Sequence, residues 1–216
     1  MVITFDGASC TGKSTLARIV AKKLGYNFMN SGMIYRAVTY YLLKKSIKPD
    51  NTNDIENELS KMQIDVKFFD EQQRVYVNHF DCSDYVSTIE VTQYVGIFSQ
   101  NPILRVLIES VQRDFAKSHN CVFEGRDLGS VVFPDADFKF YITCDIDVRA
   151  KRRFNDLFNE NQNLTINKVK VMLEERDRLD INRKISPLIK PQNAIEIDTS
   201  KDTIEESVKK ILRYIK

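Results

Sequence analysis

The feature that most constrains this chain lies near its N-terminal end, where residues 7–14 read G-A-S-C-T-G-K-S and match the pattern G-x-x-x-x-G-K-[ST]. A short apolar run at residues 2–5 precedes the pattern and predicts a buried strand. Apolar residues at helical spacing come after it, and the helix they predict ends at Gly25, a residue type that commonly closes helices. The chain must therefore place a glycine-rich loop between a buried strand and an amphipathic helix.

This order of strand, loop and helix is the context in which the pattern binds polyphosphates. Successive backbone N–H groups and the positive end of the helix face the anion. Gly12 lets the backbone approach the phosphates, Lys13 reaches the outer ones, and the Ser14 hydroxyl can ligate Mg²⁺. A chance glycine-rich turn is the alternative, and the context disfavours it. We therefore expect a nucleoside triphosphate site with Mg²⁺ as cofactor, formed by Gly7, Ala8, Ser9, Cys10, Thr11, Gly12, Lys13, Ser14 and Thr15.

Length and composition exclude several other classes of protein. The 216 residues are 43% hydrophobic and 29% charged, which is typical of a folded domain and not of a disordered or fibrous chain. No apolar stretch reaches the roughly 18–20 residues of a membrane span, and we expect no secretory signal. A net charge of +2 gives no indication of a nucleic-acid or membrane partner. The scattered cysteines are expected to be free thiols of a cytoplasmic protein: Cys10, Cys82, Cys121 and Cys144.

Strand-like and helical segments alternate along the chain. Further strands are predicted at about 26–29, 121–123, 138–144 and 194–197, with helices between them and at the C-terminus. The alternation predicts a parallel sheet with helices on both faces. Two segments interrupt it. Residues 64–69 and 74–80, joined by residues 70–73, have the pattern of an inserted antiparallel hairpin, and residues 149–182 form a charge-dense helical stretch. An insert and an arm on an α/β core suggest a protein that closes over a ligand.

The arginines indicate which reaction such a chain performs. A guanine-reading Asn-Lys-x-Asp motif is absent from the sequence. Five arginines lie near predicted strand ends or helices that face the loop: Arg36, Arg105, Arg126, Arg176 and Arg183. Planar guanidinium groups suit phosphate oxygens and could hold a second phosphate in line with the γ-phosphoryl group of the donor. Phosphoryl transfer needs mostly positioning and charge neutralisation, so no histidine base is required.

Five segments carry a pattern in common with a known family: residues 7–15, residues 30–36 (N-S-G-M-I-Y-R), residues 124–134 (E-G-R-D-L-G-S-V-V-F-P), residues 149–153 (R-A-K-R-R) and several positions within 175–188. Together they resemble the bacterial cytidylate kinase family of P-loop nucleoside monophosphate kinases. The resemblance covers essentially the whole chain. It implies a single α/β domain, 1–216, with a three-layer α/β/α fold and a parallel core sheet. The core would comprise residues 1–58, 101–148 and 186–216, with an antiparallel acceptor insert at about 59–100 and a helical lid at about 149–185.

The resemblance also implies residue roles. Lys13, Arg126, Arg153 and Arg176 would be catalytic, and Arg149 and Arg153 would clamp the ATP phosphates when the lid closes. The phosphate-loop pattern itself gives Ser14 as the metal ligand. The acceptor CMP would contact Ser31, Arg36, Ser99, Arg105, Gly125, Arg126, Asp127, Arg176, Asp180 and Arg183. Arg176, Asp180 and Arg183 are spaced to share one helix face.

Taken singly, these residues have structural alternatives. Arg36 could be solvated, Asp127 could cap a helix, and residues 149–153 could form an exposed face. The row of Arg176, Asp180 and Arg183 could be a helix-stabilising charge ladder. Their order behind a phosphate loop favours the functional interpretation.

Three positions depart from the family pattern. Cys10 stands where the family usually has glycine, so the loop must accommodate a β-carbon there. Asn30 and Glu124 each stand where an aspartate is usual, near the expected Mg²⁺. These departures leave the outer ligands of the metal open.

The function that these observations favour is transfer of the γ-phosphoryl group of ATP to CMP or dCMP by a monomeric enzyme with no nucleic-acid or membrane partner. A kinase for another small acceptor, such as UMP, dTMP or shikimate, is the first alternative. A non-catalytic nucleotide-binding switch module is the second.

Overall fold

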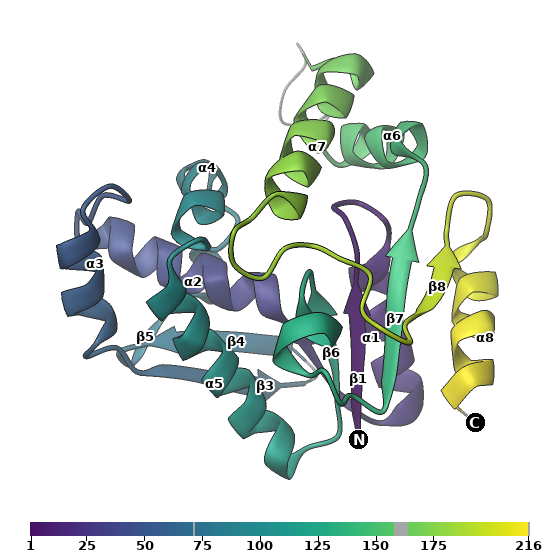
Figure 1. Cartoon of the computed structure of the whole chain (residues 1–216), viewed down its shortest axis with the longest axis horizontal. Helices are drawn as coiled ribbons and strands as arrows, with labels where there is room; N and C mark the ends of the chain where they lie inside the picture. The colour runs from purple at the N-terminus through teal and green to yellow at the C-terminus, as the bar shows by residue number, and fades with distance from the viewer. Residues whose placement is uncertain (71, 158–163, 216) are drawn as a thin grey trace. The chain divides into compact units, whose positions relative to one another are not determined.

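The computed structural model describes residues 1–70, 72–157 and 164–215 of the chain. It divides into two compact units, which are drawn in Figure 1: one is formed by Met1–Tyr26 with Cys121–Lys216, and the other by Asn27–Asn120. The first unit is thus made from both ends of the chain, and the second is one continuous insertion between them.

The first unit contains four strands of a parallel sheet, in the order β6, β1, β7, β8. Their bounds are β1 Val2–Asp6, β6 Cys121–Gly125, β7 Phe138–Thr143 and β8 Ile195–Asp198. At the carboxyl end of β1, Asp6 pairs with Gly125 of β6 and with Tyr141 of β7. The sequence-based prediction of a parallel α/β sheet is therefore confirmed. The loop after Asp6 leaves the sheet at its carboxyl edge, where ligands bind in open α/β sheets.

Helices of the first unit pack on the sheet and on each other. Helix α1 (Lys13–Leu24) packs against α8 (Ile204–Ile215), and the ring of Tyr214 in α8 lies edge-on to Phe140 of the sheet. Phe140 in turn contacts Phe5, with ring centroids 5.2 Å apart, so these residues share the face that α8 covers.

Two further helices of the first unit, α6 (Ile146–Leu157) and α7 (Ile166–Ile181), form a pair. Their apolar contact is a small cluster of Ala150, Val169 and Leu173. These helices lie within the lid predicted at 149–185, of which residues 158–163 lie outside the described part of the chain.

The second unit begins with β2 (Asn27–Asn30) and α2 (Ser31–Lys44) and contains a three-stranded antiparallel sheet in the order β3, β4, β5. The strands are β3 Ile64–Phe69, β4 Gln72–Val77 and β5 Phe80–Asp81. Its other helices are α3 Thr52–Leu59, α4 Ile89–Phe98 and α5 Pro102–Ser118. Helix α2 packs against α4 and β4, and α5 packs against α3 and β3.

The predicted antiparallel hairpin is confirmed, with its first strand at Ile64–Phe69. The predicted start and end of its second strand were wrong. Gln72 and Gln73 belong to β4 and not to the connection, because they pair with Phe69 and Phe68. Phe80 does not end the second strand. The chain turns at Asn78 and His79, which both have positive φ, and Phe80 pairs back onto Val77 as part of a third strand. Glu71, in the predicted connection, lies outside the described residues.

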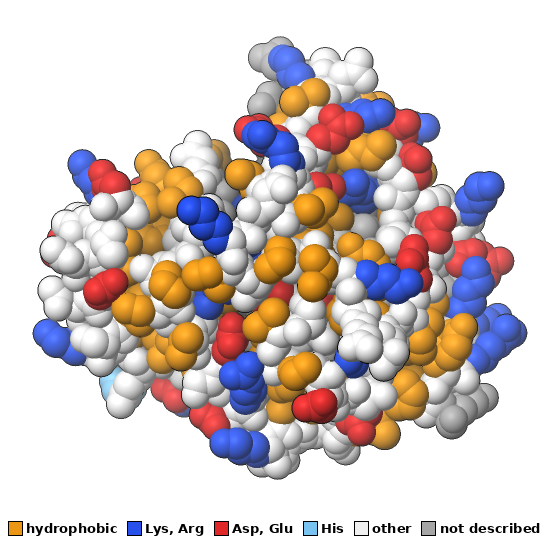
Figure 2. All heavy atoms as spheres, in the orientation of Figure 1, with side chains coloured by type: hydrophobic (Ala, Val, Ile, Leu, Met, Phe, Trp, Pro, Cys, Tyr) orange, Lys and Arg blue, Asp and Glu red, His pale blue; other side chains and the backbone are white. Residues whose placement is uncertain are grey.

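The second unit is wider than the acceptor insert predicted at 59–100, because α2, α3 and α5 also pack within it. The division into core, insert and lid stays a prediction. On the face of the molecule seen in Figure 2, Lys and Arg side chains are interspersed with Asp and Glu, in keeping with the near balance of charge in the sequence. Among the described residues, no helix is long and apolar enough to span a membrane.

Candidate active site

The glycine-rich loop between β1 and α1 depends on backbone conformations that few residues adopt. Gly7 has φ +149°, and a β-carbon built on it would lie 2.3 Å from the carbonyl oxygen of Ile142. Gly12, just before α1, has φ +86°. Between them Cys10 has φ +61°, in the left-handed region, although it carries a side chain. The loop therefore accommodates the β-carbon at Cys10 by keeping a glycine-like backbone, at a cost of about 1 kcal/mol.

The carbonyl groups of Ala8 and Ser9 in the loop accept hydrogen bonds from side chains. Ala8 O accepts hydrogen bonds from Lys13 Nζ at 2.9 Å and from Thr11 Oγ1 at 3.2 Å. Ser9 O accepts one from Arg149 Nη1 at 3.2 Å. In a planar trans peptide the N–H points away from the C=O, so the amides of Ser9 and Cys10 are turned the other way. Oriented amides of this kind form an anion-binding concavity.

Lys13 is buried with a carboxylate. Its side chain is 5% exposed, and its Nζ lies 3.4 Å from Glu124 Oε1, at the end of β6. Burial, together with the nearby charge of Arg126, lowers the pKa of Lys13 to about 8, and Glu124 opposes this shift. The positive charge of the ammonium group is thus only partly balanced by Glu124. A phosphate bound beside it would favour the charged form.

Three of the predicted arginines converge on one buried carboxylate, that of Asp180 in α7, which is 1% exposed. Arg126 Nε lies 3.0 Å from Asp180 Oδ2 and Arg176 Nε lies 3.4 Å from Oδ1, while Arg183 also donates to Oδ1. Burial by itself would raise the pKa of Asp180, but the three guanidinium groups hold it below its ordinary value. Arg126 also donates to Ser9 Oγ at 2.8 Å, which ties the cluster to the glycine-rich loop.

Arg149 and Arg153 lie in α6. Arg149 is buried and donates to Asp177 Oδ2 of α7 at 2.6 Å, so it links α6, α7 and the loop carbonyl of Ser9. Arg153 is half-buried, and its charge acts on the Cys10 thiol. Burial nevertheless raises the pKa of Cys10. The cysteines are free, as predicted, with Cys82 and Cys121 buried and Cys10 and Cys144 half-buried.

Asp6 fixes the segment that carries Arg126 and Asp127. Its carboxylate accepts hydrogen bonds from the backbone N–H groups of Leu128 at 2.9 Å and Gly129 at 2.7 Å. Asp127 precedes the helical turn Leu128–Val132, is buried, and its carbonyl accepts from Val131 N at 2.9 Å. Gly125 ends β6 in pairing with Asp6. Asp6 therefore holds the chain on both sides of Arg126, at Gly125 through strand pairing and at Leu128 and Gly129 through its carboxylate.

We expect the variant Asp6→Asn to alter how stability depends on pH. Burial raises the pKa of Asp6 from 3.8 to about 7, so the folded state binds this proton more tightly than the unfolded state. The stability that Asp6 confers is therefore present at low pH and is lost as pH rises toward 7. Asparagine does not ionise, so the free energy of unfolding of the wild type, relative to the variant, should fall by about 1 kcal/mol per pH unit between about pH 5 and 7. Urea unfolding across that range measures the difference, and a difference that does not change with pH would contradict the assignment.

The remaining predicted acceptor residues lie in the second unit. Ser31 is buried at the start of α2. Arg36 is half-buried and not simply solvated, since its Nη1 donates to Val86 O and to Thr92 Oγ1, each at 3.0 Å. Arg105, in α5, is 2% exposed, and its Nη1 donates to Ser99 O at 2.9 Å. The Ser99 hydroxyl donates to Gly96 O at 3.1 Å. Within this unit the structure brings Arg105 and Ser99 together, and Arg36 contacts both the segment before α4 and α4 itself.

Comparison with known proteins shows which family the chain belongs to. A family model described as cytidylate kinase matches residues 3–216 of the chain. A cytidylate kinase of Protochlamydia amoebophila is 39% identical over 218 residues, which cover 99% of this chain and 96% of the relative. The chain belongs to the cytidylate kinase family. A second relative, the cytidylate kinase of Clostridioides difficile, is 38% identical over 215 residues, covering 100% of this chain and 98% of the relative.

One solved structure shares the fold at low sequence identity. It is an uncharacterized protein from Eubacterium ventriosum, with a TM-score of 0.54 and 12% identity over 100% of this chain and 98% of that chain. At this identity the likeness concerns the fold alone.

Two departures from the cytidylate kinase pattern have a structural account here. Asn30 caps α2, because its Oδ1 accepts from Met33 N at 3.0 Å, and its backbone N–H donates to Gln73 Oε1 at 2.7 Å. An aspartate could make the same cap. Glu124, one methylene longer than the usual aspartate, reaches Lys13.

Sequence reasoning assigned no role to two residues of this site, Asp6 and Asp177. The only signal in the sequence was position: Asp6 directly precedes Gly7, and Asp177 lies in a segment that resembles the family. Their partners, Gly129 and Arg149, lie 123 and 28 positions away in the sequence.

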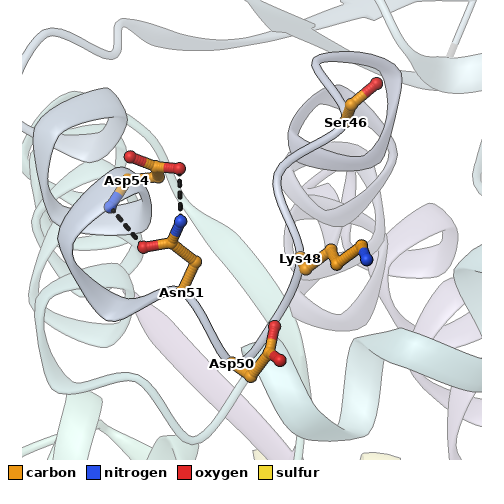
Figure 3. Close-up of a pocket in the computed structure, with 5 residues that line it drawn as sticks. All are labelled: Ser46, Lys48, Asp50, Asn51 and Asp54. Carbon is orange, nitrogen blue, oxygen red and sulfur yellow. Dashed lines mark hydrogen bonds between the residues drawn. The ribbon is translucent and has the colours of Figure 1, made fainter.

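A separate hollow of about 400 Å³ lies between α2 and α3 (Figure 3), lined by Ser46, Lys48, Asp50, Asn51 and Asp54. Two of these lining residues are hydrogen-bonded to each other: Asn51 caps α3 by accepting from Asp54 N at 3.2 Å. This hollow contains none of the predicted site residues, and its polar contacts stabilise the start of a helix.

Proposed function

We propose that this member of the cytidylate kinase family transfers the γ-phosphoryl group of ATP to CMP or dCMP, giving ADP and CDP or dCDP. The observation that carries the proposal is the convergence of guanidinium groups from residues 126, 176 and 183 beside the glycine-rich loop, where Lys13 is also buried. Such a site offers one set of donors to a triphosphate and another to a monophosphate. The identity of 38–39% to two cytidylate kinases over nearly the whole chain supports the choice of acceptor.

The donor phosphates would bind at the loop between β1 and α1. The amides of residues 8–14 and the N-terminus of α1 would donate to the phosphate oxygens, and Lys13 would exchange its contact with Ala8 O for the outer phosphates. Thr15 comes next, on the exposed side of α1. The half-buried Arg153 and the buried Arg149, both on α6, would add positive charge from the lid side.

The metal that accompanies ATP fits the residues at the loop. Among residues 1–70, 72–157 and 164–215, no group of three or more His, Cys, Asp or Glu could hold a metal by itself. Mg²⁺ commonly binds through one or two protein oxygens together with substrate phosphates. The half-buried hydroxyl of Ser14, at the start of α1, would provide such an oxygen. When bound with ATP, Mg²⁺ neutralises charge on the phosphates.

The acceptor phosphate would bind to the arginines around Asp180. Guanidinium forks hold phosphate oxygens in two parallel bonds, and Asp180 fixes the spacing of the forks. Four residues of the second unit stay predicted acceptor contacts: Ser31, Arg36, Ser99 and Arg105. Because the transition state of phosphoryl transfer is loose, these cations need only align the two phosphates and stabilise charge on the transferring group.

A coupled ADP-release assay tests the acceptor directly. ATP and Mg²⁺ are held constant while CMP, dCMP, UMP, dTMP and shikimate are compared, and a reaction without acceptor serves as the blank. We expect the cytidine nucleotides to exceed the others at least tenfold in kcat/KM. A faster reaction with another acceptor would replace the proposed substrate. ATP binding without acceptor-stimulated turnover would instead indicate a switch module. Monomeric state and cytoplasmic location stay predictions.

A further inference from the structure

Thr199, which directly follows β8, makes a buried contact with the glycine-rich loop. The residue is 4% exposed, and its Oγ1 lies 2.7 Å from the carbonyl oxygen of Thr11, 188 positions earlier in the chain. Its backbone N–H donates to Thr143 O at the end of β7, at 3.0 Å, which fixes where the side chain starts. The last strand of the sheet is thereby joined to the loop by one hydroxyl group.

The Thr199 hydroxyl also accepts a hydrogen bond, from Arg152 on helix α6. Arg152 Nη1 lies 3.3 Å from Thr199 Oγ1, and Nη2 donates to Thr199 O at 2.9 Å. A guanidinium group can only donate and a carbonyl oxygen can only accept. Thr199 Oγ1 therefore accepts from Arg152 and donates its own proton to a carbonyl oxygen. Of the two carbonyl oxygens in reach, Thr11 O at 2.7 Å is closer than Thr143 O at 3.2 Å. The chain of donors therefore runs from Arg152 through Thr199 to Thr11.

The contact determines the orientation of one peptide group in the loop. Thr11 C=O and Gly12 N–H belong to the same planar trans peptide and point in opposite directions. Gly12 has φ +86°, and in the part of the chain that the structure describes no side chain caps the helix that begins after it. A glycine in this position has no side-chain steric barrier to rotation of the preceding peptide. Something outside the loop must hold the carbonyl if the amide is to face a phosphate.

We propose that Thr199 is a positioning residue for ATP: by binding Thr11 O, it aims the Gly12 amide at the phosphates. Arg152 connects this contact to α6, the helix that carries it. Its Nη1 also lies close to Gly12, 3.6 Å from the place that a β-carbon there would take. The proposal rests on the phosphate-binding role of the loop in the proposed function. It adds a residue that lies outside all five segments that resemble the family.

The test compares the affinity of the full-length chain for ATP with Mg²⁺, measured by calorimetry without any acceptor. Thr199→Val removes the hydroxyl at nearly constant volume and should raise the Kd for ATP about tenfold, the effect of one lost hydrogen bond. Thr199→Ser keeps the hydroxyl and should bind ATP within about twofold of the wild type. The matched control is Thr39→Val in α2, where a fully buried hydroxyl donates to Tyr35 O at 2.8 Å. That control should lose stability and keep its ATP affinity.

Equal ATP affinity of Thr199→Val and the wild type, with a loss of stability like that of Thr39→Val, would overturn the proposal and leave Thr199 a purely structural residue. If the valine variant does not fold, Thr199→Cys is compared with Thr199→Ser, because a thiol is a weak donor in nearly the same space. Equal affinity of those two would also overturn it. Failure of the proposed function is seen separately, as a wild type that binds ATP and phosphorylates no cytidine nucleotide.

Discussion

Replacing Lys13 with alanine is expected to lower kcat about a thousandfold, the effect of removing a preorganised charged donor from the transferring phosphates. Lys13 is the only lysine of the glycine-rich loop, and its pKa, lowered to about 8, shows that its charge is poorly compensated before ATP binds. Steady-state kinetics at saturating ATP and CMP measure the loss. Lys23→Ala, on the exposed face near the end of the same helix, is the matched control and should keep wild-type turnover.

The same pKa gives a second signature for Lys13. Above about pH 8 the ammonium group of the free enzyme loses its proton, so the Kd for ATP should rise with pH in the wild type. The alanine variant should lack that dependence. Because the substitution leaves Glu124 buried without its lysine, folding is checked by circular dichroism, and Lys13→Ala combined with Glu124→Gln removes the unpaired charge. Near-normal turnover in a folded Lys13 variant would contradict the role assigned to the loop.

Replacing Gly7 with alanine should damage both stability and ATP binding. Alanine would have to adopt φ +149° and place its β-carbon 2.3 Å from Ile142 O, a backbone atom of β7 that cannot move without distorting the sheet. We expect the free energy of unfolding to fall by about 3 kcal/mol. The start of the loop must shift to relieve the contact, so the ATP affinity should fall at least tenfold. Urea unfolding and calorimetry measure the two effects.

Gly25→Ala separates the steric effect from the conformational one. Gly25 also has a positive φ, +68°, but no atom of the described residues would lie within 4 Å of its β-carbon. This variant should lose only about 1 kcal/mol, the cost of a left-handed alanine, and keep its activity. If Gly7→Ala proved no less stable than Gly25→Ala, the close approach to Ile142 would not be what requires glycine at position 7.

Local patterns in the sequence were enough to predict the first strand, the loop and the helix that ends at Gly25. That helix closes as expected, with Gly25 at φ +68°. The same patterns placed Gln72 and Gln73 outside a strand, because polar residues at a strand start look like a turn. Only their pairing with Phe69 and Phe68 shows otherwise.

The site was predictable where a motif carries its own context, as in residues 7–15, or where spacing brings residues onto one helix face. Arg176, Asp180 and Arg183 meet as that spacing indicated. The contacts of Asp6 with Gly129 and of Thr199 with Thr11 could not be predicted from the sequence, because each joins residues more than a hundred positions apart. A hydrogen bond to a backbone group leaves no mark on the sequence of the partner.

The cluster around Asp180 has a consequence for what the enzyme can accept. Three guanidinium groups and one carboxylate leave two positive charges in this group of side chains. A phosphate monoester carries up to about two negative charges near neutral pH. A nucleotide would therefore cancel the charge of the cluster, whereas a nucleoside without phosphate would leave its repulsion in place. If the acceptor phosphate binds this cluster as proposed, its charge makes the enzyme discriminate against nucleosides that carry no phosphate.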